Sequence, residues 1–243
     1  MKNIDGINLK YKIYGEGDLV VLLHGWGQNI KMMEPLVKAL KTKKVLIIDL
    51  PGFGETSEPS FVWSIENYAD FVKKIVDNLG YEKCSLIGHS FGGKIALMYA
   101  SKYEVDKLIA LASPFKPEVK KDNLKVKLLK AAKKVPVLKG TVEFAKKHMG
   151  STDYRNASGV MRDILVKHVN LDISDSLKNI SAPCLIVWGD NDTTVDVSTA
   201  YELEKLIKDS GVVILKGTHY AYLENLNQML NIIRSFMGDD NKW

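Results

Sequence analysis

The sequence predicts an α/β protein with a mostly parallel central sheet, helices on both faces and a helical insertion. Strand-like apolar runs alternate with segments of helical spacing over residues 1–113, and the alternation resumes from residue 182. This order is typical of parallel strands joined by helical crossovers. Residues 114–178 contain helical stretches but no convincing strand. We therefore expect a core domain of residues 1–113 and 179–243, with residues 114–178 as the insertion.

The N-terminal elements follow from apolar periodicity. Residues 7–13 are apolar at every second position, which indicates a half-buried strand, whereas 19–23 and 45–50 are apolar throughout and suit strands buried on both faces. Ser64 is a suitable N-cap for a helix that Gly80 ends. The predicted strands are 7–13, 19–23, 45–50, 84–88 and 105–112, and the predicted helices are 31–40, 65–79 and 91–103.

The later elements are predicted in the same way. Within the insertion, Leu124, Leu128, Ala132 and Val135 share one helix face, and Pro136 breaks that helix. After it we expect strands at 185–188 and 212–215, helices at 201–207 and 222–236, and a frayed tail from residue 239.

Composition and charge exclude several classes of protein. Hydrophobic residues make up 46% and charged residues 26% of the chain, which are ordinary globular proportions. No run of 18 apolar residues predicts a membrane span, and the N-terminus lacks the apolar core of a secretory signal, so we expect a cytoplasmic protein. We expect Cys84 and Cys184 to be small buried residues of strands.

The basic residues are concentrated in the insertion. Residues 114–170 hold fourteen Lys and Arg and five Asp and Glu, which gives +9 against +5 for the whole chain. A solvated helical face explains such a block most simply. The sharper alternative is a docking surface for an acidic partner or an anionic substrate, and a membrane-surface helix is disfavoured because Pro136 shortens the apolar stripe.

The central motif is the sequence from Gly88 to Gly92, GHSFG, between a predicted strand and a predicted helix. G-x-S-x-G in this context is the nucleophile elbow, in which a sharp turn with φ > 0 exposes the serine at the carboxyl end of the sheet. Ser90 is therefore the candidate nucleophile. A glycine-rich turn with an incidental serine is the alternative interpretation.

A nucleophilic serine needs a base, and the base needs an orienting acid. Asp190 and Asp192 follow the strand 185–188, and His219 follows the strand 212–215. The carboxyl ends of parallel strands meet at one edge of the sheet, where sites form. We expect His219 to be the base and one of the two aspartates to be the acid.

The other four histidines are assigned elsewhere. We expect His24 to shape a glycine-rich turn and His89 to point away from the nucleophile. His148 and His168 lie in the insertion and are predicted to be solvated.

The oxyanion of the reaction needs two preorganised N–H donors. The backbone N–H of Phe91 follows the nucleophile at a helix N-terminus, and the backbone N–H of Trp26 lies in an earlier glycine-rich loop, HGWG. We predict that these two groups form the oxyanion hole, with the Trp26 side chain as pocket wall.

Five motifs together carry a family resemblance. They are HGWG at 24–27, DLPGFGETS at 49–57, GHSFGG at 88–93, GDND at 189–192 and GTHYAYLEN at 217–225. In this order they resemble the α/β-hydrolase superfamily over nearly the whole chain outside the insertion. The resemblance implies the α/β-hydrolase fold, with residues 114–178 as a helical cap, or lid. It implies Asp192 as the acid, with Asp190 as the alternative.

The resemblance also assigns supporting residues and excludes other chemistry. It implies that Gly52 and Gly54 support a loop near the site and that Glu224 supports the loop of His219. A serine at the elbow argues against a haloalkane dehalogenase. No metal-binding or nucleotide-binding motif is present, so we expect no metal, no cofactor and no nucleic-acid partner.

The function predicted from these residues is hydrolysis of a small-molecule carboxylic ester by a Ser90–His219–Asp192 triad through an acyl-enzyme. The HGWG start also resembles pimeloyl-carrier-protein methyl ester esterases, which dock an acidic acyl carrier protein on a basic cap. A C–C bond hydrolase or lactonase with the same triad is a further alternative, as is a slow-turnover signalling receptor of the same fold.

Overall fold

The structure is a computed structural model that describes residues 1–117, 157 and 159–238. The predicted helix around Leu124–Val135, most of the basic block, His148 and the tail from residue 239 lie outside the described residues. The division at residues 114 and 178 therefore stays a prediction.

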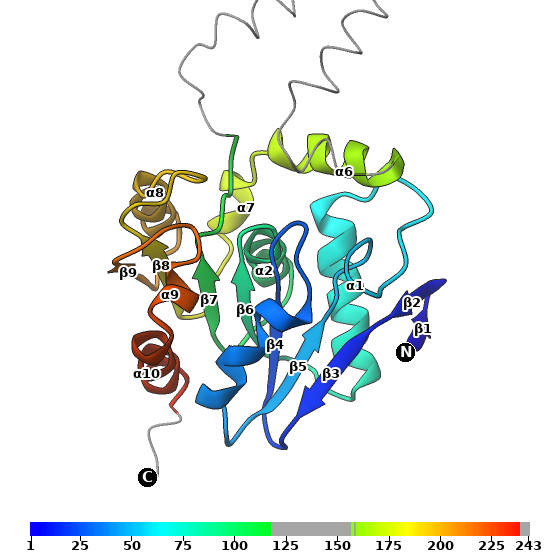
Figure 1. Cartoon of the computed structure of the whole chain (residues 1–243), viewed down its shortest axis with the longest axis horizontal. Coiled ribbons are helices and arrows are strands. Elements are labelled where there is room, and N and C mark those ends of the chain that lie inside the picture. The colour runs from blue at the N-terminus through cyan, green and yellow to red at the C-terminus, as the bar shows by residue number, and fades with distance from the viewer. Residues whose placement is uncertain (118–156, 158, 239–243) are drawn as a thin grey trace, which may run out of the picture.

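A seven-stranded sheet forms the centre of the described molecule, in the order β3-β5-β4-β6-β7-β8-β9. Only β3 runs antiparallel, beside β5 at one edge, and every other pair is parallel. The predicted α/β class with a mostly parallel sheet is confirmed (Figure 1). The strands are β3 (Tyr11–Tyr14), β4 (Leu19–Leu23), β5 (Lys44–Ile48), β6 (Ser85–His89), β7 (Leu108–Leu111), β8 (Cys184–Gly189) and β9 (Ser210–Leu215).

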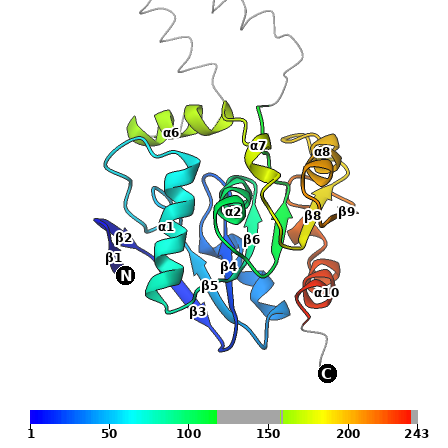
Figure 2. The ribbon, with the colours of Figure 1, turned by 180° about the vertical axis from the view of Figure 1, so that it is seen from behind.

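Helices cover both faces of this sheet. One face packs on α1 (Ile65–Asn78), α2 (Phe91–Lys102) and α8 (Ser198–Leu206). The other face packs on the 3₁₀ helices η1 (Ile30–Met32) and η2 (Glu34–Ala39), and on α9 (Ala221–Glu224) and α10 (Leu226–Met237). The two views from opposite sides show these two layers (Figures 1 and 2). Alternate side chains of β4 feed the two cores, which explains why this strand is apolar at every position.

The start and end of α1 agree with the sequence. Ser64 accepts a hydrogen bond from the Asn67 backbone N–H, and the Asn67 side chain accepts one from the Ser64 N–H, which completes a capping box. Gly80 follows the helix with φ +80°, a conformation that favours glycine.

Two predicted N-terminal elements differ in the structure. Residues 7–13 form two strands, since β2 (Ile7–Leu9) pairs with β1 (Lys2–Ile4) in a separate hairpin, whereas β3 joins the main sheet. The predicted alternation of buried and exposed residues does not continue into β3, because Ile13 is exposed. Residues 31–40 form two short 3₁₀ helices, with Pro35 at the start of the second, where no N–H donor is needed.

Two helices of the insertion return the chain to the core, α6 (Gly159–Val169) and α7 (Ser174–Leu177). In both views α6 lies across the carboxyl end of the sheet, above α1 and α2 (Figures 1 and 2). The two cysteines are buried and free as predicted, and burial raises the pKa of both thiols to about 12.

Candidate active site

Ser90 occupies the sharp turn between β6 and α2. Its backbone has φ +52° and ψ −111°, a strained conformation for a residue other than glycine. The Ser90 N–H donates to the Leu111 carbonyl at 2.9 Å, which fixes the turn to the neighbouring strand β7. The glycines on either side are required by space, since a Cβ on Gly88 would overlap the backbone of Gly92. The elbow conformation predicted from the sequence is present.

The loop after β4 lies directly against this elbow. A Cβ on Gly92 would overlap the carbonyl oxygens of Leu23 and His24, so only glycine permits this approach. Nε2 of His24 accepts a hydrogen bond from the Leu50 N–H at 2.9 Å. Burial lowers the pKa of His24 to about 4, so this imidazole is a neutral support of the turn.

Trp26 and Phe91 lie side by side at this junction. Trp26 belongs to the loop after β4, and Phe91 is the first residue of α2. Their rings meet edge to face, with centroids 5.1 Å apart. The free backbone N–H groups at the start of α2 make this corner suitable for developing negative charge.

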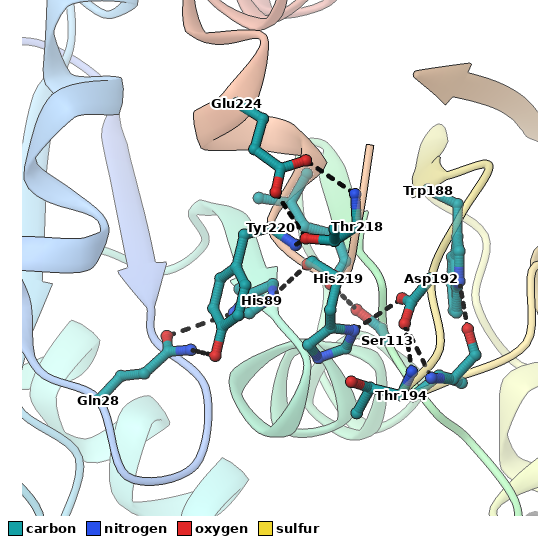
Figure 3. A network of polar contacts seen from close by, with 12 residues as sticks. Gln28, His89, Ser113, Trp188, Asp192, Thr194, Thr218, His219, Tyr220 and Glu224 are labelled. Atoms are coloured by element: carbon teal, nitrogen blue, oxygen red, sulfur yellow. Dashed lines mark hydrogen bonds and ion pairs between the residues drawn. The ribbon is translucent and has the colours of Figure 1, made fainter. Parts of the chain in front are cut away.

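Asp192 and His219 are in direct contact. Oδ2 of Asp192 lies 2.7 Å from Nδ1 of His219, and both side chains are buried. Oδ1 of Asp192 accepts hydrogen bonds from the backbone N–H groups of Thr194 and Val195 at 2.8 and 3.0 Å (Figure 3). The carboxylate is therefore held on both oxygens, and one of them is directed at the imidazole.

Two side chains fix the loop that carries His219. Glu224 accepts hydrogen bonds from the N–H and the hydroxyl of Thr218 at 2.7 and 2.6 Å. Nε2 of His89 lies 3.0 Å from the His219 carbonyl oxygen and donates to it (Figure 3). His89 directly precedes Ser90, so this bond anchors the His219 loop to the elbow. Among the described residues, the Ser90 hydroxyl makes no hydrogen bond with His219. Such contacts often tighten only when substrate binds.

Asp190, the alternative acid, faces elsewhere. Its carboxylate lies 2.6 Å from the Lys216 ammonium and accepts a hydrogen bond from the Gly217 N–H. These contacts lower the pKa of Asp190. The structure thus places Asp192, and not Asp190, on the imidazole of His219.

The prediction that His168 is solvated is wrong. The ring of His168 is stacked on Trp26, with centroids 5.5 Å apart and an interplanar angle of 17°, and its centroid lies 4.6 Å from that of Phe91. Only 7% of the residue is exposed. The helical spacing could have indicated this burial, because His168 continues the apolar stripe of Met161, Ile164 and Leu165 on the face of α6 that is buried. Met161 of α6 fills the space beside Gly52 in the same way.

Lys94 is a buried charge that the sequence reasoning missed. It lies on α2, only 1% exposed, and its ammonium donates to the carbonyls of His168 and Leu171 at 2.8 and 2.6 Å. The His168 carbonyl lies in the last turn of α6 and Leu171 lies just after it, where carbonyl groups lack helical partners. Lys94 therefore fastens the returning insertion to the helix of the elbow. The burial of Lys94 could have been predicted, because its position falls on the apolar face of the helix that begins at the elbow.

The described residues hold no cluster of three or more His, Cys, Asp and Glu arranged to bind a metal ion. No helix within the described ranges is long and apolar enough to span a membrane.

Comparison with known proteins identifies the class of protein that this fold and site define. Residues 18–142 match the alpha/beta hydrolase fold family, and the chain belongs to that family. The solved structure of the enol-lactonase from Burkholderia xenovorans is similar, with a TM-score of 0.76 and 20% identity over 97% of this chain and 98% of the lactonase. A meta-cleavage product hydrolase from Pseudomonas fluorescens matches with a TM-score of 0.74 and 19% identity over 97% and 96%.

Among curated sequences, the pimeloyl-[acyl-carrier protein] methyl ester esterase of Aeromonas hydrophila is 28% identical over 93% of this chain and 97% of its own. The relatives of this chain are hydrolases, which is the coarse activity that the comparisons support.

Proposed function

We propose that the protein is a serine hydrolase that cleaves carboxylic esters through an acyl-enzyme. Ser90 is the nucleophile, His219 the general base and acid, and Asp192 the orienting acid. The observation that carries the proposal is the buried contact between Asp192 and His219, with the second Asp192 oxygen held by two backbone N–H groups. This arrangement suits a base that must be held in one tautomer.

The geometry of Asp192 decides which imidazole nitrogen acts. A carboxylate only accepts hydrogen bonds, so Nδ1 of His219 carries the proton that it donates to Asp192. Nε2 is then unprotonated in the neutral ring and can accept the proton of the Ser90 hydroxyl. The serine oxygen adds to the ester carbonyl, and the carbonyl oxygen becomes the oxyanion, which the backbone N–H groups of Trp26 and Phe91 would stabilise.

The second half of the reaction reverses the proton movements. His219 passes its proton to the leaving alcohol as the carbon–oxygen bond of the ester breaks, which leaves the acyl group on Ser90. A water molecule then gives a proton to His219 and adds to the acyl carbon, and the acid departs as Ser90 takes its proton back.

The direct test is steady-state hydrolysis of a chain-length series of aryl esters. The wild-type protein should turn over repeatedly, whereas Ser90→Ala should lose on the order of 10³-fold or more in kcat, because triad members act as a unit. Ser101→Ala, also on α2 and hydrogen-bonded to Met98 of its own helix, is the matched control and should retain activity. A single stoichiometric burst without turnover would favour the slow-turnover signalling receptor.

A second candidate is hydrolysis of a methyl ester carried by an acidic carrier protein. It is favoured by the similarity to the Aeromonas hydrophila esterase and by the +9 charge of residues 114–170. Long-range attraction should then make kcat/KM for a carrier-linked ester fall steeply with salt, while small neutral aryl esters respond little. Replacing Lys127, Lys130 and Lys134 with glutamine should act like salt, and equal responses of the two substrates would exclude docking. Adding a lactone and a dienol diketone to the panel tests the lactonase and C–C hydrolase alternatives.

A further inference from the structure

The imidazole of His168 is buried without a hydrogen-bond partner. Nδ1 of His168 is completely covered, and no described residue bonds to it. Burial is the main cause that lowers the pKa of His168 to about 3, with the nearby charge of Lys94 acting in the same direction. The ring is therefore neutral, with one nitrogen that donates and one that accepts.

An unpartnered buried nitrogen is unfavourable, and a phenylalanine would fill the same aromatic surroundings without that cost. The ring is also held firmly. It stacks on Trp26 and contacts Phe91, while Lys94 binds the carbonyl of the same residue at 2.8 Å. Because Nδ1 is covered in this structure, a ligand atom reaches it only by displacing the groups that cover it, and the missing hydrogen bond favours that exchange.

The position of His168 indicates which part of a substrate would reach it. Its two ring neighbours are Trp26 and Phe91, whose backbone N–H groups are the proposed oxyanion donors. The aromatic side chains around His219 form a different group, with His89 and Tyr220 at centroid distances of 4.9 and 5.7 Å. The leaving alcohol must lie beside His219 to receive its proton, so the acyl group takes the side of His168.

We propose that His168 is a specificity-determining residue that hydrogen-bonds a neutral oxygen, keto or hydroxyl, in the acyl chain of the ester. The inference rests on the proposed ester hydrolysis. The preferred substrate is then an acyl ester that is apolar next to the ester carbonyl, where Trp26, Phe53 and Phe91 form an aromatic wall, and oxygenated farther along the chain.

The test compares aryl pentanoate with aryl 4-oxopentanoate, and aryl hexanoate with aryl 5-oxohexanoate. For at least one pair, the wild-type protein should favour the keto ester by about tenfold in kcat/KM, the equivalent of one buried hydrogen bond. His168→Phe keeps an aromatic ring and should abolish this preference while the plain ester is still hydrolysed. His168→Asn, which can place an amide near the position of Nδ1, should restore part of it. His168→Leu serves where the phenylalanine variant does not fold.

The outcomes separate the inference from the function on which it rests. In one outcome, the plain esters are hydrolysed in a Ser90-dependent way, but the ratio of kcat/KM for keto and plain esters is the same in the wild type and in His168→Phe or His168→Leu. This result would overturn the role of His168 alone. Absence of Ser90-dependent hydrolysis of any of the four esters would overturn both.

Discussion

Asp192→Asn tests the proposed triad at the residue whose contacts the structure defines most completely. Oδ1 of Asp192 accepts hydrogen bonds from the N–H groups of Thr194 and Val195, so the amide oxygen of asparagine must take that place. The amide nitrogen then faces Nδ1 of His219 at the 2.7 Å position and donates to it. This inverts the tautomer of His219, so that Nε2 carries the proton and cannot accept one from Ser90.

The expected loss in kcat is on the order of 10²–10⁴-fold, as substitutions that impose the wrong tautomer cause in serine hydrolases with a Ser-His-Asp triad. Initial rates with an aryl ester at saturating concentration measure it, and circular dichroism verifies the fold. Asp190→Asn is the matched control, because it changes the same chemical group in the same turn but disturbs only Lys216 and Gly217. A kcat for Asp192→Asn within tenfold of the wild type, or a larger loss in Asp190→Asn, would refute the reasoning.

Three further predictions concern stability and support. Gly92→Ala should lower the free energy of unfolding by about 1–3 kcal/mol in urea titrations, because its Cβ would overlap two backbone carbonyls, whereas Gly159→Ala has open space and should not destabilise. Burial lowers the pKa of Lys94 to about 8, so between pH 8 and 10.5 the unfolded state binds more protons than the folded state. The free energy of unfolding of the wild type should therefore rise relative to that of Lys94→Met by up to about 1.4 kcal/mol per pH unit, and a flat difference would contradict this. Glu224→Ala removes both side-chain contacts to Thr218 and should lower kcat. The free energy of unfolding should change little, since Glu224 binds an exposed loop. An unchanged kcat would show that the position of His219 does not depend on Glu224.

The parts of the fold that the sequence predicted well are those with strong local signals. The continuous apolar run of β4, the capping box of α1 and the elbow at Ser90 each depend on residues within a few positions of one another. The division of residues 7–13 into two strands was not predicted, because it depends on their different pairing partners, β1 for β2 and β5 for β3.

The site was predictable where a motif fixes the position of a residue after a strand. The choice between Asp190 and Asp192 depended on the family resemblance, and only the structure shows which carboxylate meets His219. The buried faces of α6 and α2, on which His168 and Lys94 lie, could have been predicted from helical spacing, but the contact between them could not. It joins segments 74 residues apart in the chain, which no local pattern specifies.

The central claim is that Ser90 becomes acylated during turnover. The most direct measurement mixes the protein with an activated aryl ester, quenches it with acid during the burst of aryl alcohol, and determines the intact mass and the modified peptide. The account predicts one added acyl group, located on Ser90, in amounts that match the burst, and none in Ser90→Ala. A burst without an adduct, or an acyl group on another residue, would contradict it.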